Sequence, residues 1–387
     1  MTSIDTASRE QTATRLAFFV VGFGMSAWAP LVPFAQARSG IGAYGLGLLL
    51  LCLGAGSIVT MSLAGALAAR FGCRRVMIAS TVPLCVSLPL LAVLVHPAAL
   101  AGALLMFGGA LGSLDVTMNI QAIIVERASG RAMMSGFHGL FSVGGIAGAA
   151  SVALTLGVGA SPLVATLSVV AIIVAVIGLA RPHLLAYGSD ADAPGFALPR
   201  GIVLFIGALC FVAFLAEGAM LDWSAVFLTS ALGMATAYAG LGYATFSATM
   251  TIGRLTGDRV VARFGGSAVV VFGGLFAALG FLLATLAMAW PLALLGFGLI
   301  GAGCANIVPV LYTSVGRQSV MPEHAGVSAV TTLGYAGILA GPALIGFVAQ
   351  AASLSFAFLL LMLLQLGVAV SGWPLLRDAR LTSCRRH

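Results

Sequence analysis

Three acidic residues, Asp115, Glu217 and Asp222, lie within long apolar stretches of the sequence. An ionisable side chain at the centre of a membrane helix costs about 2.5–3.5 kcal/mol on insertion scales, so it has a functional or a pairing reason to be there. A carboxyl group in such surroundings can bind and release a proton or hydrogen-bond a polar solute. The alternative for each residue is a structural role, in which its hydrogen bonds fix the packing of neighbouring helices.

Asp115 begins a polar stripe on its predicted helix. Asn119 lies four residues further on and therefore on the same face, and Glu126 extends the stripe towards the end of the segment. This pattern favours Asp115 as a proton or substrate site, with Asn119 beside it.

Glu217 and Asp222 share one predicted helix but point in different directions. They are five residues apart, which separates them by about 140° around the helix axis. Glu217 is followed by Gly218 and Ala219, whose small side chains leave room for a ligand. Glu217 is therefore a second candidate for proton or substrate binding, whereas Asp222 lies closer to the helix end, beside Trp223.

His138 lies in a second polar stripe, with Ser135 three residues before it and Ser142 four residues after it. Imidazole titrates near physiological pH, so His138 either relays protons with Asp115 or simply packs in the helix bundle. Other side chains in apolar segments could line a polar cavity: Trp28, Gln36, Asn306, Tyr312 and Tyr335. Trp28 offers a stacking surface for a sugar or an aromatic ligand, or is an ordinary core residue.

The composition indicates that membrane helices position these residues. Of 387 residues, 60% are hydrophobic and 7% are charged, against about 25% charged in soluble domains, which argues against a soluble enzyme. All 18 basic residues are Arg, and they are scattered, so the net charge of +7 indicates loop charges of a membrane protein and not nucleic-acid binding. The six Cys and five His have no CxxC or HxxxH spacing, so we expect no disulfide framework, no metal and no cofactor.

Twelve apolar runs reach the length of about 20 residues that a membrane helix needs. We therefore predict an all-α integral membrane protein with spans at 14–37, 44–70, 74–95, 98–126, 133–157, 161–180, 200–229, 237–263, 267–288, 290–317, 323–350 and 353–376. Of the 18 arginines, all but Arg38 fall at or near one side of these spans. Because short cytoplasmic loops are rich in Arg, both termini are predicted to be cytoplasmic.

The chain divides into two halves that echo each other. Residues 181–199 form a polar, Pro- and Gly-containing cytoplasmic linker between a six-helix half at 1–180 and a second at 200–387. The segment 69–72 recurs at 262–265, and the GxxxG pair Gly144 and Gly148 recurs as Gly337 and Gly341, both at an offset of 193. Repeated halves of this kind are a known design of secondary transporters.

With this repeat the sequence resembles the major facilitator superfamily, which has twelve spans in two halves, a central loop, and a GxLaDrxGrr motif after spans two and eight. The motif residues in the first copy are Gly65, Arg70, Gly72, Arg74 and Arg75, with Ala69 at the acidic position. Those in the second copy are Gly257, Asp258, Arg259 and Arg263. The resemblance implies that the motif latches the cytoplasmic ends of the halves through charge pairs, one of which lacks its acid here.

Residues 112–119, 137–145 and 217–223 are similar to bacterial inner-membrane transporters that are distantly similar to fucose permease. In this superfamily spans one, four, seven and ten line the central cavity, which implies that Asp115 and Glu217 face it. Spans one and seven are neighbours at the outer end, so we hypothesise an Arg38–Asp222 ion pair that closes an outer gate. The alternative is that Arg38 extends to the lipid headgroups.

The resemblance implies a secondary active transporter that moves a small polar solute, sugar-like or an organic metabolite, across the bacterial inner membrane by alternating access. The sequence has no GxxxxGK[ST] motif, so an ion gradient would supply the energy, and the acids favour proton-coupled symport. The alternative is a proton-coupled exporter of drugs or metabolites. No catalytic cluster indicates an enzyme. The expected partners are the small-molecule substrate, protons and the lipid bilayer, with no nucleic acid, and the chain is expected to be a monomer.

Overall fold

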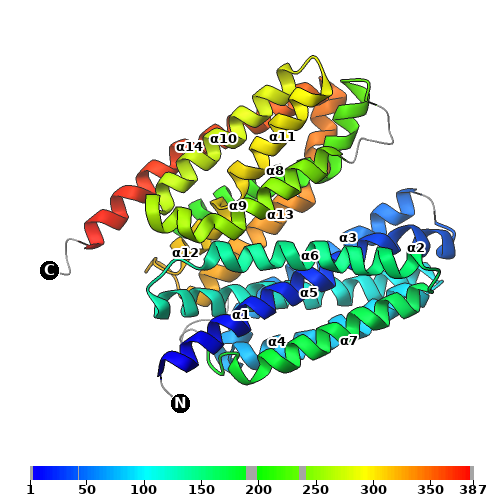
Figure 1. Ribbon diagram of the computed structural model, residues 1–387, viewed down its shortest axis with the longest axis horizontal. Helices are drawn as coiled ribbons and strands as arrows, with labels where there is room; N and C mark the ends of the chain where they lie inside the picture. Colours follow the sequence, from blue (N-terminus) through cyan, green and yellow to red (C-terminus); the bar gives the residue numbers. More distant parts are fainter. Residues whose placement is uncertain (1–2, 42, 189–197, 235–240, 384–387) are drawn as a thin grey trace. The chain divides into compact units, whose positions relative to one another are not determined.

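Every regular element in the described part of the chain is helical (Figure 1). Helices suit an apolar chain of this kind because they satisfy all backbone hydrogen bonds within one segment, where a bilayer offers no water. The computed structural model describes residues 3–41, 43–188, 198–234 and 241–383.

The helices group into two compact units. Unit 1 is Met1–Arg131, Phe137–Val203 and Val315–Thr332, and unit 2 is Ala132–Gly136, Leu204–Ser314 and Leu333–His387. Each unit thus takes in a short segment from the other part of the sequence. The predicted boundary at 181–199 falls in unit 1, but residues 189–197 lie outside the described part.

The helices of unit 1 are α1 (Ser3–Ser26), η1 (Ala29–Leu31), α2 (Val32–Ser39), α3 (Ala43–Phe71), α4 (Cys73–Val93), α5 (Pro97–Ser129), α7 (Pro162–Ala180) and η2 (Arg181–His183). The helices wholly or largely in unit 2 are α8 (Ile202–Ser230), α9 (Leu241–Phe264), α10 (Gly266–Leu286), α11 (Trp290–Cys304), α12 (Ile307–Val315) and α14 (Leu354–Ser383). Two helices are divided: α6 (Met134–Gly157) begins in unit 2 and continues in unit 1, and α13 (Glu323–Ala351) does the reverse.

Eleven of the helices in the described residues are long and apolar enough to cross a membrane. Eleven of the twelve predicted spans overlap one of these, with ends that differ by a few residues, and the first corresponds to Ala7–Leu31. The predicted span 237–263 corresponds to α9, which is 24 residues long but carries Arg254, Asp258, Arg259 and Arg263 and does not meet the same criterion. The number of twelve therefore stays a prediction.

The duplicated segment has the same local structure in both copies. Gly72, before α4, has φ 83° and ψ 152°, and Gly265, before α10, has φ 81° and ψ 152°, a conformation that favours glycine. The preceding arginine lies over the following phenylalanine ring in each copy, at 5.3 Å for Arg70 on Phe71 and 5.5 Å for Arg263 on its neighbour. This agreement supports the interpretation of the halves as a repeat.

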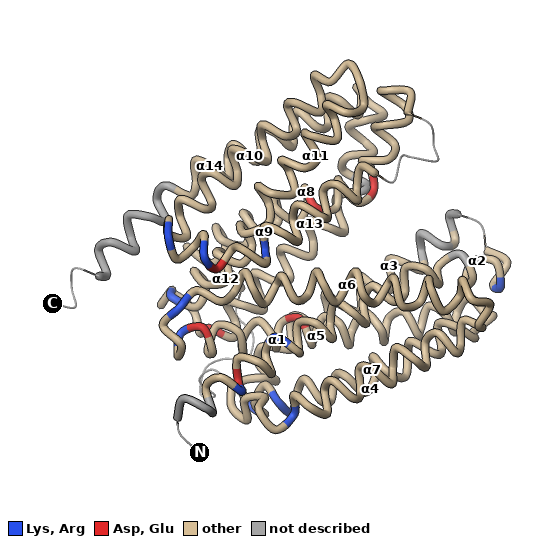
Figure 2. The backbone as a smooth tube through the Cα atoms, viewed as in Figure 1, with Lys and Arg blue, Asp and Glu red and all other residues tan. Residues whose placement is uncertain are grey.

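The basic residues are unevenly distributed along the helices of each unit. In each unit most basic residues lie at one end of the helices, and the basic residue of α2, Arg38, lies at the other end of unit 1 (Figure 2). This is the distribution that the one-sided arginine count predicts.

The two GxxxG pairs lie where helix backbones approach closely. Gly144 on α6 faces the backbone carbonyl of Phe19 on α1, so that a Cβ atom at this position would overlap the carbonyl oxygen. Its counterpart Gly337 faces the carbonyl of Phe211 on α8 in the same way. Gly341 has more room, because its nearest neighbour, the Leu215 Cδ1 atom, lies at an ordinary contact distance of 3.4 Å from a Cβ position.

We expect Gly144→Ala to destabilise the protein by about 1–3 kcal/mol, because α1 and α6 would have to move apart. The matched change Gly341→Ala adds the same methyl group where it fits, and should be tolerated. The measurement is the yield of monodisperse protein in detergent and its thermal unfolding temperature. Equal losses for both variants would contradict this explanation of the close approach.

Candidate functional site

Inside unit 2, α8 and α9 bring an acid and a base together. The Nη2 atom of Arg254 donates to Oε1 of Glu217 at 3.1 Å, and the two side chains are 7% and 17% exposed. Removing a charge from water is costly, and the attraction between opposite charges offsets this cost only when their geometry is good. Glu217, predicted as a proton or substrate site, therefore has a buried counter-ion.

A break in the predicted tenth span holds Arg254 in place. α11 ends at Cys304 and α12 begins at Ile307. Pro309 has no N–H and so cannot donate to the carbonyl of Ala305, four residues earlier. The Nε atom of Arg254 donates to that carbonyl at 3.3 Å. Because of this proline, the Ala305 carbonyl can accept from Arg254 and orients the guanidinium group independently of Glu217.

Asn306, in the same break, ties the tenth span to α9. Its Nδ2 atom donates to the carbonyl of Gly253 at 3.0 Å. A Cβ atom at Gly257 would overlap the Asn306 Oδ1 atom and would lie 2.6 Å from the Ser135 Cβ atom. Gly257, a predicted motif residue, is thus the position at which three segments of unit 2 meet.

The second motif copy anchors the start of α6. Both carboxylate oxygens of Asp258 accept from the backbone N–H of Gly136 at 3.0 Å. A carboxylate at a helix N-terminus is stabilised by the unpaired N–H groups and by the helix dipole. This contact lies within unit 2, which includes Gly136.

The first motif copy, which lacks the acid, uses close packing at the start of α13 within unit 1. Gly65 on α3 contacts the backbone carbonyl of His324, and the Ser328 hydroxyl donates to the carbonyl of Met61. Nearby, Arg127 at the end of α5 pairs with Glu323 and also donates to the carbonyl of Gly316. The sequence did not point to this ion pair, and because Arg127 is 57% exposed, the pair adds little stability.

The remaining motif arginines lie at the surface of their units or at helix ends. Arg75, near the start of α4, and Arg259, on α9, are exposed. The backbone N–H of Arg74 donates to the carbonyl of Leu185 at 2.7 Å, which fixes the chain after η2 against the start of α4. The side chains of these three residues stay candidates for the predicted latch.

In unit 1, Asp115 and Asn119 lie on the same face of α5, as their spacing predicts. The Nδ2 atom of Asn119 donates to the backbone carbonyl of Asp115 at 2.9 Å and to the Asp115 Oδ1 atom at 3.3 Å. The described residues include ion pairs between Arg127 and Glu323 and between Arg254 and Glu217, and neither includes Asp115. Asp115 is thus a carboxyl group inside a membrane helix without a counter-ion in that set.

His138 on α6 packs against an aromatic ring. Its imidazole lies edge-on to Phe18 of α1, with ring centroids 5.2 Å apart, and the Ser142 hydroxyl donates to the His138 carbonyl at 3.2 Å. The side chain is 8% exposed. These contacts favour the packing role, and a proton relay to Asp115 stays a prediction.

Arg38 completes the end of a helix. Its Nε and Nη2 atoms donate to the carbonyls of Leu94 and Leu91 at 2.9 and 2.8 Å. These carbonyls belong to the C-terminal end of α4, where backbone acceptors lack helical donors and a cation is favourable. Asp222, on α8, is exposed. The predicted Arg38–Asp222 pair would join residues of different units and stays a prediction.

The residues predicted to line a cavity have different surroundings. Trp28, between α1 and η1, is 5% exposed, and its indole N–H has no acceptor among the described residues. Tyr312 on α12 is 1% exposed. Tyr335 on α13 lies edge-on to Phe214, at 6.4 Å between centroids. The side chain of Gln36 lies outside the described part of the structure.

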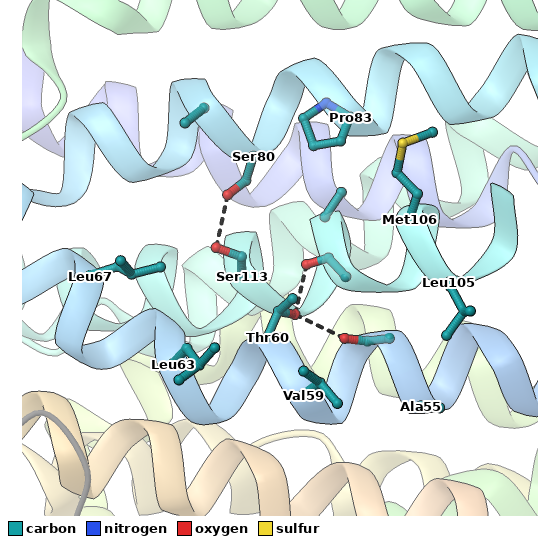
Figure 3. Close-up of a pocket in the computed structure, with 14 residues that line it drawn as sticks. Ala55, Val59, Thr60, Leu63, Leu67, Ser80, Pro83, Leu105, Met106 and Ser113 are labelled. Atoms are coloured by element: carbon teal, nitrogen blue, oxygen red, sulfur yellow. Dashed lines mark hydrogen bonds between the residues drawn. The ribbon is translucent and has the colours of Figure 1, made fainter. Parts of the chain in front are cut away.

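Unit 1 also has an apolar groove of about 590 Å³ between α3 and α4, with α5 as its floor (Figure 3). Its polar groups are paired: the Ser80 hydroxyl donates to Ser113 Oγ at 2.8 Å, and the Thr60 hydroxyl lies 2.8 Å from the carbonyl of Gly109. None of the predicted site residues lines the groove.

Known proteins match this chain over more than nine-tenths of its length. No protein-family model matches the chain. It is 54% identical over 363 residues to an uncharacterised MFS-type transporter of Yersinia pestis, where MFS stands for major facilitator superfamily, and the match covers 94% of each protein. It is 33% identical over 359 residues to an uncharacterised transporter of Sinorhizobium fredii, covering 91% of this chain and 94% of the relative.

Among solved structures, the fold is similar to the fucose:proton symporter FucP of Escherichia coli, with a TM-score of 0.77 at 17% identity over 94% of this chain and 98% of that one. At this level of identity, the similarity shows a shared fold alone.

Proposed function

Because this chain belongs to the major facilitator superfamily of transporters, we propose that it is a secondary active transporter that carries a small polar solute together with protons. Its helices span a membrane many times, with both termini on the side where the arginines gather. The solute would be taken up by symport and its access would alternate between the two sides of the membrane.

The observation that carries this proposal is the carboxyl group of Asp115. It lies on a membrane helix, accepts a hydrogen bond from Asn119, and has no ion-pair partner among the described residues. A lone carboxylate would make the dry, closed state of a transporter costly, whereas its protonated form is neutral. A proton bound at Asp115 therefore removes the main electrostatic barrier to the change of access.

Glu217 has a different role in this proposal. Its negative charge is balanced by Arg254, so the site as a whole is neutral without a proton. We assign a coupling proton to Asp115 and place the Glu217–Arg254 pair at the substrate site. FucP is a proton symporter for fucose, but proton coupling is extended to this chain because of Asp115 and not because of 17% identity.

The test begins with purified protein and a thermal-shift screen of sugars, amino acids and organic acids. A stabilising solute is then used in vesicles that contain the protein. We expect uptake of the labelled solute to be driven by an inward proton gradient and to stop when a protonophore removes the gradient. Uptake that is indifferent to the gradient would contradict proton coupling.

A further inference from the structure

The Glu217–Arg254 pair carries an inference about the charge of the substrate. We infer that the solute carries an anionic group, such as a carboxylate, which takes the place of the Glu217 carboxylate on Arg254 while Glu217 takes up a proton. This inference rests on the proposed transport function and adds a substrate class to it.

Of the two partners, the Glu217 carboxylate is the one that can leave the pair. Arginine keeps its charge in proteins, whereas a carboxylate is neutralised by one proton. A cationic solute that paired with Glu217 would draw the Glu217 carboxylate away from the buried guanidinium group, which is costly. An anionic solute that pairs with Arg254 leaves Glu217, which a proton makes neutral. The exchange with an anion is the one that keeps the site uncharged before and after binding.

Glu217 and Arg254 differ in how exposed they are and in how they are anchored. The Glu217 side chain is 17% exposed and that of Arg254 is 7% exposed, so the acid is the more accessible partner. Arg254 has a second anchor, because its Nε atom donates to the Ala305 carbonyl that Pro309 leaves without a helical donor. The guanidinium group is thus held in place when Glu217 withdraws. Its planar set of N–H donors matches the two oxygens of a carboxylate.

Other ionisable groups surround Glu217. The Tyr243 phenol on α9 lies near Glu217, Arg254 and Asp222, and the Cys210 and Cys304 thiols lie near Glu217. Asp222 is the second acid in this set, and it is exposed. Arg254 is the cation of the group, and an incoming anion therefore binds at Arg254.

The experiment uses formate as a minimal anion and does not require the natural substrate. Glu217→Gln mimics the protonated acid and removes the Glu217 negative charge from beside Arg254. We expect formate to raise the unfolding temperature of this variant by about 2–4 °C, because a ligand that binds the folded state stabilises it. Equal concentrations of chloride and of formamide, the neutral analogue of formate, should have smaller effects.

The double variant Glu217→Gln/Arg254→Gln is the matched control and should show no specific response to formate. An equal response in both variants, or no response in Glu217→Gln, would overturn the inference. If Glu217→Gln does not fold, the wild-type protein supplies the test. Formate should then stabilise wild type more at pH about 5.5 than at pH about 8, where Glu217 is ionised and holds Arg254, and a stabilisation equal at both pH values would overturn the inference.

This result is independent of the test of proton coupling. Solute uptake driven by a proton gradient, with no formate effect, would refute the anionic substrate and leave the proposed function intact. A formate effect without gradient-driven uptake would refute proton-coupled uptake and leave anion binding at Arg254 intact.

Discussion

Replacing Arg254 with glutamine is expected to destabilise the folded protein by about 3–5 kcal/mol and to abolish transport. Removing one partner of a buried ion pair leaves the other charge without compensation, and this penalty is larger than the net contribution of the pair itself. Here the Glu217 carboxylate would be left without Nη2 of Arg254 at 3.1 Å. The loss should appear as a lower unfolding temperature and a lower yield of folded protein.

Two variants separate the charge effect from a general effect of mutation. Arg259→Gln makes the same change at an exposed position of the same helix, where surface substitutions alter stability by less than about 0.5 kcal/mol. Arg254→Gln/Glu217→Gln removes both charges and should recover most of the stability, because no lone charge remains. Transport should stay absent in the double variant. A double variant as unstable as Arg254→Gln would show that packing, and not charge, dominates at this site.

Asp115→Asn is expected to remove one proton from the coupling, and so to lower proton-driven accumulation of the solute while leaving exchange of solute across the membrane. Asparagine has nearly the shape of a protonated aspartic acid, but it cannot release a proton. One pH unit across the membrane is worth 1.36 kcal/mol, so one coupled proton supports about tenfold accumulation. The variant should lose this tenfold accumulation and still equilibrate labelled with unlabelled solute.

The conservative variant Asp115→Glu keeps a titratable group and should retain part of the coupling. Asn119→Ala removes the hydrogen bond to the Asp115 carboxyl and should shift the pH dependence of uptake without abolishing it. A purely structural role of Asp115 predicts a different pattern. In that case Asp115→Asn would lower accumulation and exchange in equal measure, together with the unfolding temperature.

Much of the fold could be predicted from sequence because membrane helices are long and apolar. Helix α5, for example, begins at Pro97 and ends at Ser129, within a few residues of the predicted span 98–126. The breaks were harder to predict. The predicted first span is divided by η1 and the tenth by the turn before Ile307. Each break contains or precedes a proline, and membrane helices often tolerate proline without a break.

The candidate site could be predicted only where its residues lie on one helix. The spacing of Asp115 and Asn119 fixes their shared face, and the structure has the expected hydrogen bond. Glu217 and Arg254 lie on different helices, and their pairing depends on the rotation of each helix about its axis, which apolar periodicity does not determine. Pro309 was the signal available in the sequence, since a proline four residues after Ala305 leaves a carbonyl that needs another donor.

The most direct test of proton coupling at Asp115 is the internal pH of vesicles that contain the purified protein. Vesicles loaded with a pH-sensitive dye are mixed with a solute identified by thermal shift, without an imposed pH gradient. We predict that the solute acidifies the interior of wild-type vesicles, and that Asp115→Asn vesicles exchange the solute with less acidification per solute taken up. Equal acidification by Asp115→Asn, or solute entry into wild-type vesicles with no change in internal pH, would contradict it.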